Sequence, residues 1–187
     1  MADKKEKPVE SFECQFMSES TCCEMDTMEF YKERVTYLEK LVKRYKYDML
    51  TGLMGKRDFS AKFDRLFEEC KFANEKFYFV LIDIDNLHNL NREKGYHEGD
   101  KVIKSVADNL IEQFEFHQCY RISGDEFAVL VRAYHCDEAE MNEKLKTVKN
   151  STWVLGKSCD GEFINPKHLF KYTDTQLTKK KGDRRRI

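Results

Sequence analysis

Two groups of acidic residues could do chemistry in this chain. Asp83 and Asp85 close the most apolar run of the sequence, Phe77–Ile84, and a spacing of two in an extended segment directs both side chains to one face. A buried strand that ends in two carboxylates is costly unless a cation or hydrogen-bond donors compensate. A metal site would explain the pair, and capping of the next helix is the structural alternative.

The second group is Ser123–Glu126, which lies between two strand-like runs, Cys119–Ile122 and Phe127–Val131. Only a tight hairpin turn fits there, with the glycine expected to supply a positive φ and the two acids lifted to the tip. If this hairpin pairs beside the first acidic strand, three or four carboxylates converge at one sheet edge. Oxygen ligands of this kind suit Mg²⁺ or Mn²⁺, which would neutralise a triphosphate and lower the pKa of an attacking hydroxyl.

An amphipathic helix is predicted over residues 27–47, ahead of these motifs. Its apolar residues alternate at spacings of three and four, which is the pattern of a heptad seam. A seam shorter than three heptads is marginal as an independent dimer, so a coiled-coil stalk and a helix docked on its own domain both remain open. The seam consists of Met28, Tyr31, Val35, Leu38, Val42 and Tyr45.

The rest of the chain alternates between helical and strand-like patterns, which predicts an α/β sandwich with a mixed sheet. Proline at the first turn favours the start of the last helix. The expected helices run from Phe59 to Cys70, around Leu87 and Leu90, from Val102 to Ile111, over Asp137–Lys149 and over Pro166–Lys180; the expected strands are Phe77–Ile84, Cys119–Ile122, Phe127–Val131 and Ser151–Gly156.

Length and composition allow one domain with an appendage. The 187 residues are 41% hydrophobic and 36% charged, as in a folded, helix-rich protein. The net charge of −1 gives no general attraction to nucleic acid or to anionic membranes, so no specific nucleic acid partner is expected. No run reaches the roughly 18 apolar residues that span a bilayer, and the first residues lack a signal peptide pattern. We therefore expect no membrane span and a cytoplasmic location.

Seven cysteines are present, an odd number whose spacings match neither a zinc ribbon nor a Cys-x-x-Cys pair. They are interpreted as free thiols in a reducing compartment. Cys14, Cys22 and Cys23 cluster within residues 1–26, which lack an apolar period and are predicted to be a flexible leader. A metal or redox role for this cluster is the alternative.

Several linked motifs, in this order and spacing, resemble the diguanylate cyclase GGDEF domain. The resemblance covers residues 48–187 and implies a palm-like nucleotidyl cyclase domain, in which helices flank a mixed central sheet and a helical stalk precedes them. The motifs that carry it are Asp48–Leu53, Asp83–Asp85, Asn91, Gly95, Gly99–Asp100, Arg121–Phe127, Thr173–Asp174, Leu177, Lys181 and Arg185.

The resemblance also implies roles at the metal. Asp83 and Asp125, with the carbonyl of Ile84, would hold Mg²⁺ or Mn²⁺. Glu126 would assist at the reacting 3′-hydroxyl or at a second metal ion. These residues are the implied catalytic and metal-binding set.

For the nucleotide, the resemblance implies that Asn91 and Asp100 read the guanine edge of GTP. Lys181 and Arg185 would contact the β- and γ-phosphates, where a basic pair is physically most useful. A solvated or nucleic-acid-attracting tail is the alternative interpretation of the basic residues at this end. Asn86–His88 would also adjoin the substrate, by their place after the metal strand.

Four departures from the family pattern bear on catalysis. Ser123 replaces the first glycine of the signature, and Tyr96 stands where histidine is usual. Asn86–His88 replaces aromatic residues followed by lysine, so a mostly neutral imidazole takes the place of a phosphate-binding cation. The stretch between Val131 and Trp153 is short.

The implied reaction condenses two GTP molecules into cyclic di-GMP and releases two pyrophosphates, in a homodimer that the stalk and the facing active sites form. A catalytically weak or inactive module that binds GTP or a dinucleotide is the competing hypothesis. A palm-type transferase making another cyclic nucleotide is a third. In many relatives an Arg-x-x-Asp set ahead of the signature binds the product; Phe114–His117 stands there instead, which predicts that this inhibitory site is missing.

Overall fold

The structure, a computed structural model, describes residues 27–158 and 163–184. The predicted leader, Cys159 and Arg185 lie outside these residues. In chain order the elements are α1 (Thr27–Lys46), β1 (Met54–Gly55), α2 (Lys56–Ala73), β2 (Phe77–Ile84), α3 (Leu87–Lys94), α4 (Tyr96–Gln113), a 3₁₀ turn (Phe116–Gln118), β3 (Cys119–Arg121), β4 (Glu126–Arg132), α5 (Glu138–Lys146), β5 (Ser151–Lys157) and α6 (Pro166–Arg184).

The five strands form one mixed sheet in the order β1-β3-β4-β2-β5. β1 runs parallel to β3, and every other pairing is antiparallel. β2 pairs along nearly its whole length with both β4 and β5, which explains why its sequence is apolar almost throughout. The predicted α/β fold with a mixed central sheet flanked by helices is confirmed.

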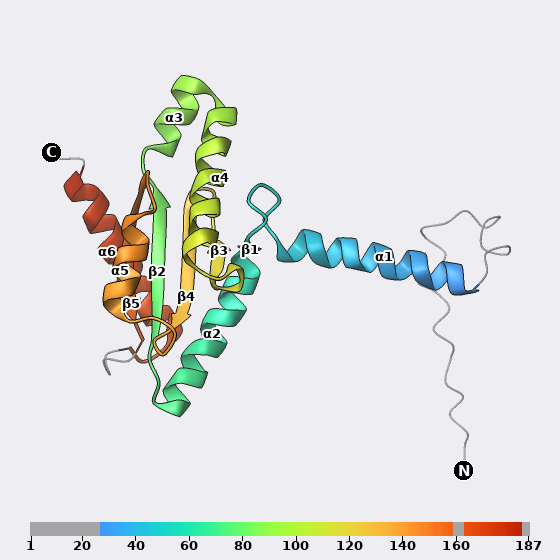
Figure 1. The fold of residues 1–187 in the computed structure, drawn as a ribbon, viewed down its shortest axis with the longest axis horizontal. Helices are drawn as coiled ribbons and strands as arrows, with labels where there is room; N and C mark the ends of the chain where they lie inside the picture. The colour runs from blue at the N-terminus through green and yellow to red at the C-terminus, as the bar shows by residue number, and fades with distance from the viewer. Residues whose placement is uncertain (1–26, 159–162, 185–187) are drawn as a thin grey trace, which may run out of the picture. The chain divides into compact units, whose positions relative to one another are not determined.

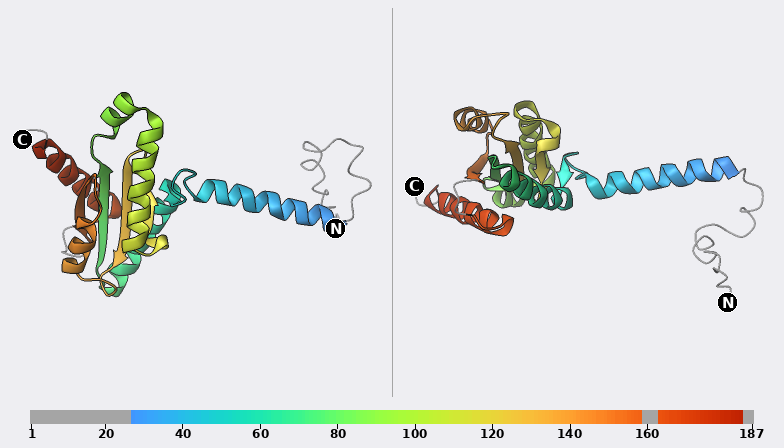
Figure 2. Two further views of the ribbon diagram at one scale, coloured as in Figure 1. Left: turned by 45° about the horizontal axis from the view of Figure 1, so that its top comes forward. Right: turned by 90° about the horizontal axis from the view of Figure 1, so that it is seen from below.

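Helices cover both faces of the sheet, so the domain has three layers. Alternate residues of β2 supply the two cores: Val80 and Ile82 face α4 and α5, and Phe77 and Phe79 face α2 and α6. Figure 2 shows this division, with α2 and α6 on one side of the sheet and α4 and α5 on the other. Asp83 continues the second set, and so its side chain belongs to the face that α6 covers.

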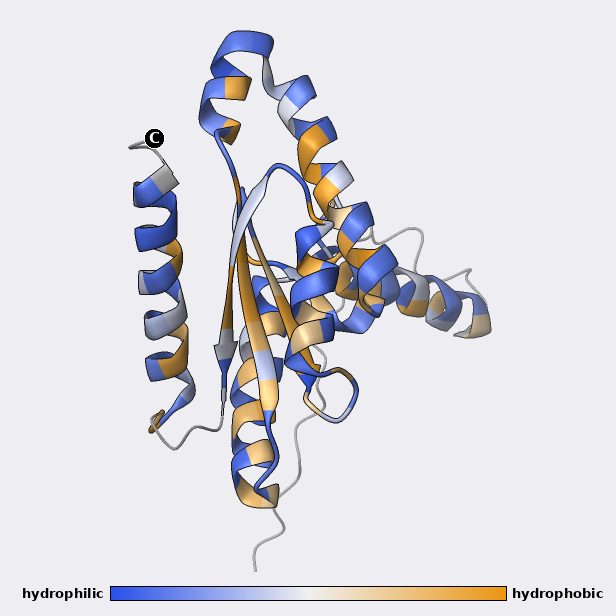
Figure 3. Ribbon diagram, turned by 60° about the vertical axis from the view of Figure 1, so that its left-hand side comes forward, coloured by the Kyte–Doolittle hydropathy of each residue, from blue (hydrophilic) through white to orange (hydrophobic). Residues whose placement is uncertain are grey.

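The helical hairpin of α3 and α4 extends past the end of β2 (Figure 1). Asn86 leaves the strand in the left-handed conformation, at φ 56°, and Gly95 joins the two helices at φ 85°. The outer end of this helical hairpin is mostly hydrophilic, whereas the strands are largely hydrophobic (Figure 3). The hairpin therefore projects polar groups beyond the edge where β2 ends.

Three local features differ from the sequence predictions. β1 is a short strand that was not predicted, and α4 begins at Tyr96 rather than near Val102, because its first turn is polar and carries no apolar period. Gly124 does not supply a positive φ; among the described glycines only Gly52 and Gly95 do. The N–H groups of Ile122 and Ser123 both donate to the Glu126 carbonyl, so the hairpin closes without a left-handed residue. Serine is therefore compatible with the first signature position.

The chain divides into two units, residues 1–42 and 43–187, and α1 runs from one into the other. The apolar seam of α1 is exposed along its length, from Met28 at 61% to Tyr45 at 67%. None of the described helices is both long enough and apolar enough to cross a bilayer.

The described cysteines, Cys70, Cys119 and Cys136, are buried and form no disulfide bond within the described part of the chain. Burial raises the pKa of the Cys119 thiol to about 12, so this thiol stays protonated at neutral pH. The N-terminal cysteine cluster lies in the part of the chain that the structure does not describe.

Candidate functional site

The predicted hairpin does pair beside the strand of Asp83. In the β2–β4 ladder Asp83 lies directly opposite Glu126, and the Ile84 N–H donates to the Asp125 carbonyl at 2.9 Å. Directly opposed residues of an antiparallel pair share a face, so the carboxylates of Asp83 and Glu126 lie together where β2 ends.

A lysine from the last helix completes this cluster. Lys181 of α6 donates a hydrogen bond to Asp83 Oδ1, and both side chains are mostly buried. The preceding residue fixes α6 to the edge strand: Lys180 Nζ donates to the Trp153 carbonyl at 2.8 Å and lies 4.3 Å from the centre of the Trp153 ring. The sequence had predicted that Lys181 contacts phosphates, and it did not reveal the carboxylate contact.

The carboxyl groups of the cluster are held in unfavourable surroundings. Burial raises the pKa of Asp83, the ammonium of Lys181 partly offsets this, and Asp125 and Asp85 add repulsion. Burial, and then repulsion from Asp83 and Asp125, raise the pKa of Glu126. Asp174 of α6 adds to this repulsion, although the sequence analysis gave it no role. A cation at this place would relieve the repulsion.

Among the described residues, no three acidic, histidine or cysteine side chains form a group that could hold a metal ion on their own. The carboxylates that were expected to converge therefore do not form a metal-binding site by themselves. The donor set still fits Mg²⁺ or Mn²⁺, because such ions are commonly bound by one or two carboxylates together with substrate phosphates. Asp83 and Asp125 are the pair available for this.

Asp85 shares the face of Asp83 but has a structural partner. Thr152, which lies opposite Asp83 in β5, donates to Asp85 Oδ1 at 2.6 Å. The Asp85 N–H bonds to the carbonyl of Asn150, a left-handed residue just before β5. Sequence reasoning missed both partners, since nothing local marks a threonine 67 positions away as the partner of an aspartate.

The two predicted guanine-reading residues come from the helical hairpin. Asn91 lies in α3 and Asp100 in α4, and both are half-buried. The Asn91 Oδ1 atom is buried and has no hydrogen-bond partner. A buried acceptor without a donor costs about 1–3 kcal/mol. This unpaired atom fits a ligand that offers N–H donors, as guanine does.

The three residues after Asp85 differ in how far their side chains are exposed. The side chains of Asn86 and His88 are exposed, whereas Leu87 is 7% exposed and packs in the core with α4. Only the main chain of Leu87 could therefore face a substrate.

A further ion pair ties the hairpin to the segment before β1. Arg121 donates from Nη1 to Asp48 Oδ1 at 2.9 Å and from Nη2 to the Gly124 carbonyl at 2.6 Å. Burial would raise the pKa of Asp48, but hydrogen bonds from Arg121 and Thr51 outweigh it and hold the pKa below its usual range. A shallow pocket of about 320 Å³ lies beside this pair and the signature turn.

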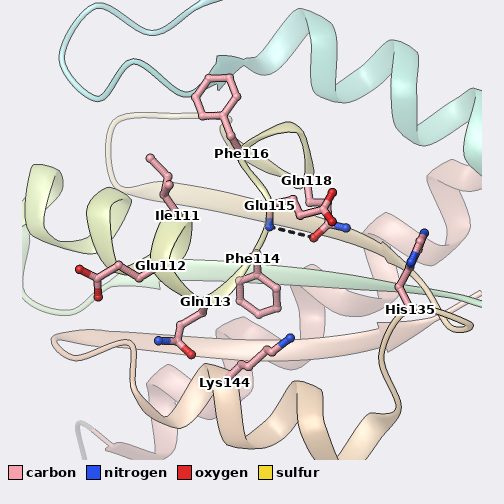
Figure 4. Close-up of a pocket in the computed structure, with 9 residues that line it drawn as sticks. All are labelled: Ile111, Glu112, Gln113, Phe114, Glu115, Phe116, Gln118, His135 and Lys144. Atoms are coloured by element: carbon pink, nitrogen blue, oxygen red, sulfur yellow. Dashed lines mark hydrogen bonds between the residues drawn. The ribbon is translucent and has the colours of Figure 1, made fainter.

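A larger pocket, of about 450 Å³, lies at the end of α4 near α5 (Figure 4). Phe114 packs there at 6% exposure, with Lys144 Nζ 5.7 Å from its ring centre. The Glu115 N–H bonds to Gln118 Oε1, and its carboxylate lies 3.0 Å from His117 Nε2. None of the nine lining residues is an arginine.

Comparisons with known proteins agree with this geometry. The sequence matches the family described as "Diguanylate cyclase, GGDEF domain" over residues 45–156. The chain is 32% identical over 123 residues to the uncharacterized membrane protein SH2145 of Staphylococcus haemolyticus, covering 62% of this chain and 34% of that protein. It is 33% identical over 97 residues to the diguanylate cyclase DgcZ of Escherichia coli, covering 51% of this chain and 32% of that protein. The matched region thus spans about a third of these relatives.

Solved structures show the same fold. The coiled coil and GGDEF domain of DgcB from Caulobacter crescentus, solved with c-di-GMP, superposes with a TM-score of 0.70 at 20% identity, covering 82% of this chain and 89% of that one. The GGDEF domain of FimX from Pseudomonas aeruginosa gives 0.65 at 16% identity, covering 74% and 94%. Taken with the match over residues 45–156, the carboxylates at the end of β2 and the mixed five-stranded sheet, the chain belongs to the GGDEF domain family of diguanylate cyclases.

Proposed function

We propose that this chain binds GTP with Mg²⁺ or Mn²⁺ and, as a dimer, condenses two GTP molecules into cyclic di-GMP with release of pyrophosphate. The observation that carries the proposal is the meeting of Asp83, Glu126 and Lys181 where β2 ends, with Asp125 bonded to the same strand through its carbonyl. The raised pKa values of Asp83 and Glu126 support a site whose carboxylates a bound cation would stabilise.

In this proposal Asp83, Asp125 and the Ile84 carbonyl hold the metal, which neutralises the triphosphate and lowers the pKa of the attacking 3′-hydroxyl. The Ile84–Asp125 hydrogen bond supports a fixed spacing between these ligands. Glu126 accepts or orients the proton of the 3′-hydroxyl, and its raised pKa makes its carboxylate a stronger base than an unperturbed one.

The nucleotide is held from two sides. Asn91 and Asp100 read the guanine edge from α3 and α4, and Lys181 of α6 binds the phosphates together with Arg185. Lys181 would exchange Asp83 for the phosphates of the bound nucleotide, because these would offer it a stronger acceptor. Asn86 and His88, being exposed, adjoin the phosphates, with Leu87 contributing main chain only.

Dimerisation is proposed to run through α1. The charged residues beside the exposed seam favour a parallel pair of α1 helices. Arg34 of one helix and Glu39 of the other occupy flanking positions that face each other across such a coil. A parallel stalk would bring two GTP sites to face each other. The proposed divisions are a leader at 1–26, this helix at 27–47 and the catalytic domain at 48–187.

A second candidate function is a GTP-binding signalling module without synthesis. The contact between Lys181 and Asp83 favours it, since an internal cation already neutralises the main metal ligand. His88 in place of the family's lysine also favours it, since an imidazole carries no permanent positive charge.

One experiment separates these functions. The purified chain is incubated with GTP and Mg²⁺ or Mn²⁺, and the products are separated by chromatography, with ATP as a parallel substrate. Cyclic di-GMP formed by the wild type and by Asp64→Ala, an exposed aspartate on α2, but lost by at least roughly 100-fold in Asp125→Ala, supports synthesis. GTP binding without product points to the signalling module. No preference for GTP over ATP contradicts both.

A further inference from the structure

Gly99, in the first turns of α4, lies directly against the side chain of Asn91 from α3. A Cβ atom built on Gly99 would fall 1.9 Å from Asn91 Oδ1, 2.9 Å from Cγ and 3.3 Å from Nδ2. The first two distances are far below any tolerated contact, and all three atoms belong to one amide. The backbone of Gly99 therefore forms one wall of the space that the Asn91 amide occupies.

The glycine has no conformational reason to be there. Gly99 lies inside a regular helix, and it is not among the glycines with positive φ. Glycine weakens a helix interior relative to alanine, so a backbone explanation would favour alanine at this position. The reason for a glycine is therefore the room that the side chain of Asn91 needs, because this side chain packs against α4 at Gly99.

Packing on Gly99, rather than hydrogen bonding, holds Oδ1 in its place. Oδ1 is buried and has no hydrogen-bond partner. The main chain of Asn91 is engaged separately, through its carbonyl and the Gly95 N–H at 2.9 Å. An alanine at position 99 would push the amide away from α4 and so change where Oδ1 lies.

We propose that Gly99 is a positioning residue for guanine specificity, which sets the place of the Asn91 amide without touching the nucleotide. The inference rests on the proposed function, in which Asn91 reads the base. It assigns the missing Cβ of Gly99 a role distinct from that of its neighbour Asp100, whose carboxylate contacts the base directly.

The test is a double-mutant cycle of Gly99→Ala and Asn91→Ala, read out by equilibrium binding of GTP and ATP. Gly99→Ala should lower the preference for GTP over ATP by roughly 5–100-fold, the loss that follows removal of one buried hydrogen-bond partner. The double variant should lose no more than Asn91→Ala alone, because Gly99 acts only through that amide. An unchanged preference in Gly99→Ala, or additive losses in the double variant, would overturn the proposal.

Thermal unfolding without nucleotide supplies a second readout, independent of GTP binding. Gly99→Ala should lower the Tm when Asn91 is present and raise it in the Asn91→Ala background, since alanine then improves the helix without a clash. A single variant that fails to fold, rescued by the double variant, supports the same conclusion. A Tm that falls in both backgrounds contradicts it. A wild type without GTP preference refutes the proposed function, whereas the Tm cycle still decides whether Gly99 positions Asn91.

Discussion

The ammonium of Lys181 lies against the carboxylate of Asp83, and so joins the last helix to the central strand across 98 positions of sequence. Asp83 is the buried acid of the cluster, and Lys181 is the group that offsets its burial in the absence of nucleotide. The charge of Asp83 is thus partly offset from within the chain.

Removal of this lysine should separate its two roles. Lys181→Ala should lower the free energy of unfolding by about 1–2 kcal/mol, less than the 3–5 kcal/mol for breaking a fully buried pair. Mn²⁺ should bind more tightly in the absence of nucleotide, because it no longer competes with the ammonium. Chemical denaturation and Mn²⁺ titration followed by electron paramagnetic resonance measure these effects. Lys171→Ala, an exposed lysine of the same helix, is the control, and equal Mn²⁺ affinity in both variants would argue against an internal counter-cation.

The stability of the nucleotide-free domain should depend on the charge of Glu126. Because its pKa is raised in the folded state, the ionised carboxylate destabilises the fold; this effect is absent well below the ordinary pKa of 4.5 and grows as pH rises through the raised value. Glu126→Gln should therefore raise the Tm at pH 7 by roughly 1–3 °C, and the difference should disappear as the pH falls well below 4.5. Melting curves over this pH range, with Glu68→Gln as the exposed control, test the sign. A lower Tm for Glu126→Gln at pH 7 would refute it.

The α1 seam should control association. Leu38→Glu removes an apolar side chain of the seam, and the dimer should weaken by roughly 10–100-fold, as expected for the 1.5–3 kcal/mol of a buried leucine. Sedimentation velocity over a concentration series measures this. Thr36→Glu adds the same charge outside the seam and should leave the oligomer unchanged. If both variants match the wild type, the alternative of a helix docked on its own domain is favoured.

Product inhibition should be competitive only. The pocket at the end of α4 presents Phe114, Glu115 and Lys144 rather than an arginine fork, so it offers little to hold a doubly charged dinucleotide. Added cyclic di-GMP should therefore slow the reaction only by occupying the GTP site. Initial rates over a GTP series with added product decide this, and inhibition that persists at saturating GTP would show a separate inhibitory site.

Local sequence patterns were sufficient for the elements that carry their own signal. The apolar run of β2 predicted a strand buried on both faces, and the turn residues between β3 and β4 predicted the hairpin that meets it. Both predictions rest on side chains that are neighbours in sequence. The two-residue strand β1 has no such signal, because its pairing with β3 depends on chain segments 66 positions apart.

The contacts that complete the site could not be predicted for the same reason. The partners of Asp83 and Asp48 are set by how α6 and the hairpin pack on the sheet, and many lysines and arginines of the chain could have served. Gly124 was assigned a positive φ on residue type, whereas the turn is closed by two N–H groups that share the Glu126 carbonyl. The roles of Asp125, Asn91 and Asp100 stay predictions until nucleotide binding is measured.

Trp153, held by Lys180 at the edge of the sheet, is the only tryptophan of the chain. Its fluorescence therefore has a single source, one residue along β5 from the threonine opposite Asp83 and in contact with the neighbour of Lys181. Any shift of α6 that draws Lys181 toward a phosphate changes the surroundings of this indole. If Lys181 leaves Asp83 for a phosphate, as proposed, this indole reports that step, and stopped-flow emission should follow it without a label.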